Sequence, residues 1–164
     1  MYIGIDPDLS GAVAVLAAAG ALLALQDIPV LSLRTSRGSR TEYDVPGLVA
    51  ILAPYVGCKA HVMLEESQAM PGQGTRSMFT IGVGFGVWLG LLGALGFAHT
   101  RVGPAVWKRH LGLTSDKEQA RWRAMQLFLA AALRRKKEHG RAEALLLAWY
   151  GEHSQQSLKA EEGR

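Results

Sequence analysis

The chain opens with the stretch that decides its fold, Tyr2-Ile3-Gly4-Ile5-Asp6-Pro7-Asp8. Its first four residues are apolar, and the Asp-Pro-Asp that follows ends a strand. Apolar segments at 11–18 and 21–30 come next, separated by a turn at Gly20, and together the three segments predict an antiparallel meander. Their alanines and leucines also suit a helix by propensity alone.

Strands and helices alternate beyond this meander. Residues 33–41 contain Arg34, Arg37 and Arg40 without an apolar period, so we expect a loop there. Asp44 is a candidate N-cap, with Pro46 in the first turn of the helix that it starts.

The remaining elements are two strands and four helices. The strands are expected at 61–64, ending at Glu65, and at 97–102; the helices are expected at 77–95, from Pro104, at 116–128 and at 139–151. This order predicts an α/β fold in which helices flank a five-stranded mixed sheet. We expect one domain over 1–151 and a polar tail over 152–164.

Composition limits the possible classes of protein. The chain has 164 residues, of which 49% are hydrophobic and 20% charged, which excludes a disordered or fibrous protein. The 18 Lys and Arg outnumber the 14 Asp and Glu, so a polyanionic partner is favoured. A single cysteine, Cys58, excludes an internal disulfide and a cysteine-rich zinc module. The apolar run 81–97 is short for a bilayer span, so we expect no membrane segment.

Carboxylates follow two of the expected strands. Asp6 ends the first strand, Glu65 ends the fourth, and Asp8 lies at i+2 from Asp6, on the same side of an extended segment. The carboxyl ends of neighbouring strands meet at one edge of a sheet. Glu143 lies within the apolar segment 142–148, where a charge needs a partner or a metal.

Several carboxylates at one point would bind a hard divalent cation. Oxygen ligands favour Mg²⁺, with Mn²⁺ as a substitute, over zinc. Two such ions can activate water and stabilise the leaving oxygen of a phosphodiester. In the alternative interpretation, Asp8 caps a turn, Glu66 is solvated and Glu143 pairs with Arg141 or a lysine. Such separate structural roles can explain each carboxylate alone, but they explain less well why all of them are expected at one place.

Basic residues fall into patches that suit phosphates better than bases. One patch is the 33–41 segment, and a second places Lys108 and Lys117 on either side of a turn. The third leads into the last helix and consists of Arg134, Arg135, Lys136 and Lys137. A solvated face is the alternative for each patch.

Glycines form a stripe on the expected helix at 77–95. Gly82, Gly86 and Gly90 recur every four residues and therefore share one helix face. Soluble helices avoid glycine, so the stripe indicates close approach to a neighbour, either the sheet of the same subunit or a second subunit.

Three segments taken together resemble the RuvC-type Holliday junction resolvases, and within them the chloroplast branch, the monokaryotic chloroplast resolvases. They are Gly-Ile-Asp-Pro-Asp-Leu-Ser-Gly at 4–11, Leu-Glu-Glu-Ser at 64–67 and Lys-Glu-His-Gly-Arg-Ala-Glu-Ala-Leu-Leu at 137–146. The resemblance extends over about 1–151. It implies a ribonuclease H-like fold and a homodimeric, Mg²⁺-dependent endonuclease that nicks four-way DNA junctions at two symmetric phosphodiesters. It also implies a role in DNA recombination and nucleoid segregation in the chloroplast.

The resemblance implies roles for individual residues. Asp6, Glu65 and Glu143 would be catalytic metal ligands, with Asp8 as a fourth ligand found in the chloroplast branch. Lys108 and Lys117 would contact backbone phosphates. The segment 67–76 would face the junction, with Met70 and Arg76 as candidate DNA contacts, and Arg134, Arg135, Lys136 and Lys137 would add further phosphate contacts.

The chain departs from the bacterial pattern at three positions. Bacterial resolvases have glycine at the position of Asp8 and two aspartates where this chain has Gly140 and Glu143. His139 lies one turn before Glu143, on the same helix face. It is a candidate metal ligand, water activator or phosphate contact, and a purely structural role is the alternative.

Two rival functions remain open at this point. One is a ribonuclease H-like nuclease that acts on structured RNA or an RNA–DNA hybrid. The other is a non-catalytic junction-binding protein, which would need the basic patches but no carboxylate cluster.

Overall fold

The structure is a computed structural model that describes residues 1–36, 38–67 and 72–162. Its strands are β1 (Tyr2–Asp6), β2 (Ala12–Leu16), β3 (Leu22–Asp27), β4 (Val30–Thr35), β5 (Gly38–Tyr43), β6 (His61–Glu65) and β7 (Ala98–Val102). Its α-helices are α1 (Val45–Leu52), α2 (Thr75–Ala94), α3 (Pro104–His110), α4 (Lys117–Leu127) and α5 (His139–Glu162). Short 3-10 turns lie at Ala18–Gly20, Ala53–Tyr55 and Lys136–Glu138.

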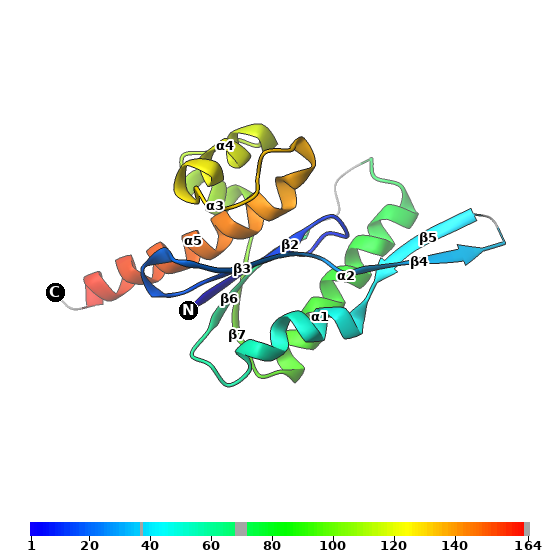
Figure 1. Ribbon diagram of the computed structural model, residues 1–164, viewed down its shortest axis with the longest axis horizontal. Helices are drawn as coiled ribbons and strands as arrows, with labels where there is room; N and C mark the ends of the chain where they lie inside the picture. The colour runs from blue at the N-terminus through cyan, green and yellow to red at the C-terminus, as the bar shows by residue number, and fades with distance from the viewer. Residues whose placement is uncertain (37, 68–71, 163–164) are drawn as a thin grey trace.

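A five-stranded mixed sheet with the order β3-β2-β1-β6-β7 forms the centre of the molecule. Strands β1, β2 and β3 are antiparallel neighbours, as the meander predicted, whereas β6 and β7 run parallel to β1. Helices α3, α4 and α5 lie over one face of the sheet and α1 and α2 over the other (Figure 1). The predicted α/β class and five-stranded mixed sheet are confirmed.

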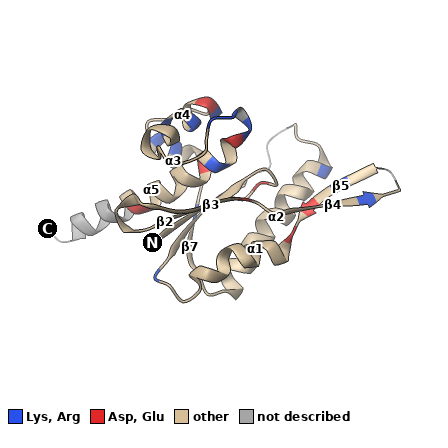
Figure 2. Cartoon of the chain, viewed as in Figure 1, with Lys and Arg blue, Asp and Glu red and all other residues tan. Residues whose placement is uncertain are grey.

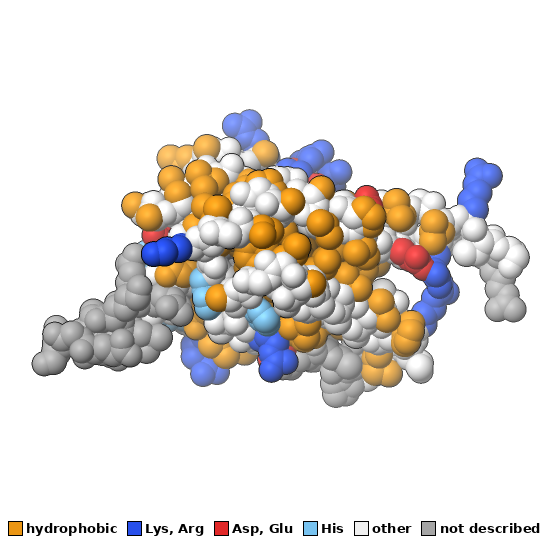
Figure 3. Space-filling view, turned by 90° about the horizontal axis from the view of Figure 1, so that it is seen from below, with side chains coloured by type: hydrophobic (Ala, Val, Ile, Leu, Met, Phe, Trp, Pro, Cys, Tyr) orange, Lys and Arg blue, Asp and Glu red, His pale blue; other side chains and the backbone are white. Residues whose placement is uncertain are grey.

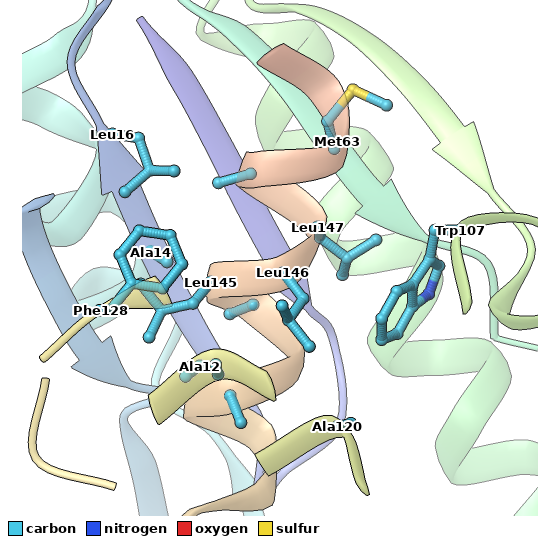
Figure 4. Close-up of a cluster of buried hydrophobic side chains, with 14 of the residues drawn as sticks. Ala12, Ala14, Leu16, Met63, Trp107, Ala120, Phe128, Leu145, Leu146 and Leu147 are labelled. Carbon is cyan, nitrogen blue, oxygen red and sulfur yellow. The ribbon is translucent and has the colours of Figure 1, made fainter. Parts of the chain in front are cut away.

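Strand β1 is buried on both faces, and its alternating residues contribute to different cores. Ile3 and Ile5 pack toward α1 and α2, with Trp88 and Leu92 of α2. The opposite core lies between the sheet and α3, α4 and α5 (Figure 4). Its buried members include Ala12, Ala14, Leu16, Met63, Trp107, Leu145, Leu146 and Leu147.

Gly4 is the point of β1 at which α5 comes nearest. A Cβ at this position would collide with the carbonyl oxygen of Ala144 and lie 2.5 Å from the amide nitrogen of Ala148. Both atoms belong to the backbone of α5, so no side-chain rotation could relieve the collision. The missing side chain at Gly4 therefore sets how close α5 lies to the centre of the sheet.

The prediction of a loop over 33–41 is wrong, because most of this segment lies in an antiparallel hairpin of β4 and β5. The hairpin extends from the sheet, and its strand residues are exposed except at the base (Figure 1). The segment lacks an apolar period because neither face of the hairpin packs on the core. Arg37 lies outside the described residues.

Helix α5 does not end at Gly151 as expected but continues to Glu162. Glu152, assigned to the polar tail, is 3% exposed. Apolar residues predict the helix up to Tyr150. Beyond Tyr150 they become rare, so the sequence gives no sign that the helix continues.

Helix α2 leaves an apolar face uncovered. It has 20 residues, and its most apolar stretch of 18 residues has a mean hydropathy of 1.6. Within the described ranges it is therefore the one helix long and apolar enough to span a membrane by length and composition, a test that core helices also pass. Trp88 and Leu92 pack on the sheet, while Phe79 is 73% and Val83 44% exposed. Apolar side chains gather on the face seen from below (Figure 3).

The glycine stripe lies on the outer side of α2. Among the described residues, nothing lies within 4 Å of a Cβ built at Gly82, Gly86 or Gly90. Of the two alternatives for the stripe, packing on the sheet of its own subunit is therefore wrong for the described residues. The close approach inside the subunit is at Gly84, which lies off the stripe: a Cβ there would collide with the hydroxyl of Tyr43.

We predict opposite effects for two Gly→Ala substitutions. Gly4→Ala should lower the free energy of unfolding by about 3 kcal/mol, because backbone atoms of α5 must move away. Gly93→Ala should raise it by up to about 1 kcal/mol, since that helical position is exposed and a Cβ there meets no described atom. Urea unfolding of both variants measures the effects. A Gly4→Ala protein as stable as wild type would contradict the packing described for α5.

Candidate metal centre at the carboxyl edge of the sheet

Three elements bring the predicted carboxylates together. Strand β1 ends at Asp6 and its parallel neighbour β6 ends at Glu65, so both side chains reach the same sheet edge. Helix α5 crosses this edge with its N-terminal half and adds Glu143. Asp6 and Glu143 are buried, at 5% and 6% exposure. The backbone N–H of Asp8 donates to Asp6 Oδ1 over 3.4 Å, which folds the loop after β1 back onto the site.

The pKa values show that these carboxylates affect one another. Burial, followed by the charges of Glu65, Glu143 and Asp8, raises the pKa of Asp6 well above its ordinary value. Burial and the charge of Glu143 raise the pKa of Glu65 to about 7, although the Trp107 hydrogen bond and Lys108 lower it. Burial also raises the pKa of Asp8, against the influence of Lys117. The site therefore resists carrying its full negative charge without a cation.

Helix α3 binds two of these carboxylates through consecutive residues. The indole N–H of Trp107 donates to Glu65 Oε1 over 2.8 Å, and Nζ of Lys108 donates to Glu143 Oε1 over 2.7 Å. Trp107 is fully buried, so its N–H needs an acceptor. The sequence alone did not reveal this role of Trp107. A tryptophan beside a lysine in the helix after β7 was the available signal.

Tyr43 was also missed, and it ties the base of the hairpin to the loop after β1. Its hydroxyl donates to the carbonyl of Pro7 over 2.9 Å. Burial and the charges of Asp8 and Asp6 raise the pKa of Tyr43 to about 12, so the phenol remains a donor. Gly84 leaves room for this ring, because a Cβ there would collide with the hydroxyl. Residues far apart in the sequence thus hold the Pro7–Asp8 backbone in place.

The structure accounts for the glycine at position 140. A Cβ there would lie 2.5 Å from the carbonyl oxygen of Ser10, 2.7 Å from Cα of Gly11 and 3.1 Å from Asp6 Oδ2. In this chain, therefore, the start of α5 packs directly on the loop that carries Asp8. An aspartate at 140 would require that loop to move.

His139 faces Glu118 in this structure. Its Nε2 lies 3.4 Å from Glu118 Oε1, and Glu118 also accepts from Arg121 over 2.7 Å. This pairing links the start of α5 to α4, which is the structural alternative considered for this histidine. A catalytic role for His139 stays a prediction.

Basic residues surround the carboxylate edge on several sides (Figure 2). Lys117 starts α4 and acts on the pKa of Asp8. Arg76, in the first turn of α2, lines a cavity of about 510 Å³ that reaches Leu9 and Tyr43. Arg135 and Lys137 line a second cavity, of about 210 Å³, against the Leu9–Gly11 loop.

Of the other predicted DNA contacts, the structure describes only Arg134 completely. Arg134 is exposed in the segment before α5. The side chain of Lys136 and the whole of Met70 lie outside the described residues. The fourth-ligand and phosphate-contact roles of all these residues remain predictions.

The donor set fits a hard divalent cation by its chemistry. Asp6, Asp8, Glu65 and Glu143 offer only oxygen atoms, which Mg²⁺ and Mn²⁺ prefer. Within the described ranges, however, no three His, Cys, Asp or Glu side chains already converge closely enough to enclose an ion. A metal held by these carboxylates would therefore need some of their side chains to move closer together.

Comparisons with known proteins agree with this description. No family model matches the chain. A segment of 89 residues, 52% of this chain, is 38% identical to the protein named Holliday junction resolvase MOC1, chloroplastic, from Chlamydomonas reinhardtii, and spans 10% of that protein's length. Among solved structures, T. thermophilus RuvC in complex with a Holliday junction substrate matches with a TM-score of 0.63 and 17% identity over 94% of each chain. A second Thermus thermophilus RuvC structure matches with a TM-score of 0.57 and 19% identity, covering 95% of this chain and 96% of the other.

The structural matches bear on the fold, and the sequence match bears on the branch of the family. The structural matches confirm the expected ribonuclease H-like fold, the fold of RuvC. The sequence match confirms the resemblance to the chloroplast branch. The chain covers about a tenth of that relative, so the relative's activity can only be proposed for this chain.

The raised pKa of Glu65 leads to a prediction about stability. A carboxyl with a raised pKa binds more protons in the folded than in the unfolded state, so the free energy of unfolding falls as pH rises. For Glu65 this loss should occur between its ordinary value of 4.5 and its folded value of about 7. We expect the metal-free wild type to lose stability over this range relative to Glu65→Gln, as measured by urea unfolding in EDTA.

Glu42→Gln, a change at an exposed carboxyl, serves as the control and should follow wild type across the same range. A difference between wild type and Glu65→Gln that stays constant from pH 4.5 to 7 would contradict the burial and charge coupling described for Glu65.

Proposed function

We propose that the chain is a homodimeric, Mg²⁺-dependent endonuclease that resolves four-way DNA junctions by symmetric phosphodiester hydrolysis. The observation that carries this proposal is the carboxylate cluster at one sheet edge, whose members raise one another's pKa values. Buried acids that repel each other stabilise no fold by themselves, and a divalent cation is the partner that suits them. The names of the similar proteins supply the substrate class.

The residues around the cluster suit a phosphodiester substrate. Asp6, Glu65, Glu143 and Asp8 would hold the metal, which when bound supplies an activated water and stabilises the leaving oxygen. Trp107 fixes one oxygen of Glu65 by its hydrogen bond. Lys108 and Lys117 approach the cluster from α3 and α4 and would bind the phosphates on either side of the bond that is cut.

A dimer suits both the substrate and the exposed face of α2. A four-way junction has two-fold symmetry, and two symmetric cuts require two active sites related in the same way. The outer side of α2 offers Phe79 and Val83 next to the glycine stripe at Gly82, Gly86 and Gly90, where no described atom covers the backbone. Covering this face with a second copy would bury apolar area that one subunit leaves in water.

The compartment that we propose is the chloroplast, with a role in plastid DNA recombination and nucleoid segregation. Its support is the name of the similar protein from Chlamydomonas reinhardtii, which is chloroplastic. Import of a tagged full-length protein into plastids, followed by microscopy, tests this assignment.

Glu143→Gln should abolish cleavage of a four-way junction, with a fall of more than about 100-fold, since the neutral amide is a poor ligand for a hard cation. Junction binding should persist, because basic residues supply most of the affinity. Glu66→Gln is the matched control: this half-buried neighbour of Glu65 should cleave at close to the wild-type rate. Assays on junction, duplex and RNA–DNA hybrid substrates, with and without Mg²⁺, measure both properties.

Activity of Glu143→Gln within about tenfold of wild type would remove Glu143 from the metal ligands. Preference of the wild type for the hybrid substrate would favour a ribonuclease instead. Binding without cleavage by the wild type in Mg²⁺ and Mn²⁺ would favour a non-catalytic junction-binding protein.

Gly86→Leu should separate the two subunits without unfolding either one. Since no described atom lies within 4 Å of a Cβ at this position, the monomer has room for the new side chain, whereas a second helix packed there does not. Sedimentation should show a folded monomer, and a cruciform plasmid should be nicked instead of linearised. Gln126→Leu, which places an exposed leucine on α4, should stay dimeric. A dimeric Gly86→Leu protein that linearises the plasmid would contradict an interface at this stripe.

A further inference from the structure

Lys108 lies inside the acidic site and not at its rim. Its Nζ is 2.7 Å from Glu143 Oε1, and the two side chains are 13% and 8% exposed. The same Nζ lies 5.1 Å from the centre of the Trp107 ring, which covers the ammonium with an aromatic surface. An ion pair so enclosed is difficult to break unless another group replaces each partner.

A divalent cation would compete with Lys108 for the same carboxylate. Glu143 is the carboxylate that α5 contributes to the site, and the charge of Glu143 acts on Asp6, Glu65 and Asp8 alike. An ammonium and a divalent ion on the same carboxylate would repel each other strongly in this poorly solvated site. The pair with Lys108 and a metal that takes Glu143 Oε1 as a ligand are therefore alternative states.

We propose that Lys108 is a built-in counter-ion that a divalent metal displaces, and that the freed ammonium then binds a DNA phosphate. This inference rests on the proposed function and adds regulation of the same site. An ammonium released from Glu143 loses its ion-pair partner, and a phosphate supplies another. Metal and DNA should therefore each strengthen the binding of the other, by the same factor.

Lys117 provides a matched comparison. Its charge also reaches the cluster, because it lowers the pKa of Asp8. In the described part of the chain, however, Lys117 makes no ion pair with any of the four carboxylates, whereas Lys108 does. Both lysines carry the same charge near the site, but only Lys108 has a carboxylate to give up to the metal.

Calorimetric titration of Mn²⁺ into the DNA-free protein tests the displacement. If the pair with Glu143 is closed for about nine-tenths of the time, Lys108→Met should bind Mn²⁺ about tenfold more tightly than wild type. Lys117→Met should gain no more than about threefold, through the general change in charge. Lys108→Gln, which keeps a hydrogen-bond donor without the charge, replaces Lys108→Met if the latter does not fold. Equal gains from Lys108→Met and Lys117→Met, or no gain from Lys108→Met, would overturn the displacement.

Fluorescence anisotropy with a labelled four-way junction tests the coupling. Ca²⁺, a hard cation with the same preference for oxygen, is the probe, and a gel confirms that the DNA stays uncut. Ca²⁺ should tighten junction binding by wild type and by Lys117→Met, and this tightening should disappear in Lys108→Met. If it persists in Lys108→Met, the coupling does not run through this lysine. Wild type that binds neither Mn²⁺ nor Ca²⁺ would overturn the proposed function too, whereas a metal-dependent nuclease insensitive to Lys108 overturns this inference alone.

Discussion

The close packing of α5 against β1 is the constraint on which the rest of the structure depends. Gly4 leaves no side chain between the two backbones, so the carbonyl of Ala144 and the N–H of Ala148 lie directly on the central strand. This contact fixes the position of Glu143 one residue earlier on the same helix, next to Asp6 at the end of the same strand. Gly140 repeats the arrangement against the Ser10–Gly11 backbone. Two glycines, one in the strand and one in the helix, thus determine where the acids of the site meet.

The carboxylate cluster destabilises the folded chain locally, and the surrounding structure compensates for this. Burial and like charges raise the pKa values of Asp6 and Glu65, so the cluster opposes its own ionisation. Helix α3 compensates through Trp107 and Lys108, which bind one carboxylate each. The indole of Trp107 anchors that helix, because it is fully buried in the core beside Leu146 and Leu147 of α5 (Figure 4). Stability is therefore provided by the apolar packing on either side of the acids and not by the acids themselves.

Local patterns in the sequence were sufficient for the sheet and for the positions of Asp6 and Glu65, because each lies where an apolar strand stops. They were insufficient where a residue's role depends on partners distant in the chain. Tyr43 reaches Pro7 across 36 positions, and Trp107 reaches Glu65 across 42. The β4–β5 hairpin was missed for a different reason, since strands exposed on both faces carry no apolar alternation. The length of α5 beyond Gly151 likewise has no periodic signal.

The central position of β1 has a consequence for synthesis of the protein on the ribosome. Within this domain β1 precedes the other elements in the chain, yet α5, which makes most of the contact with one of its faces, follows all of them. Until then Ala12, Ala14 and Leu16 on the neighbouring strand lack their main covering as well. The core on that face of the sheet therefore cannot form until α5 has left the ribosome, and until then the apolar face of the meander is exposed to aggregation. A chain that stops before His139 would retain β1, β2 and β6 but lose the helix that makes most of the contact with that face of the sheet.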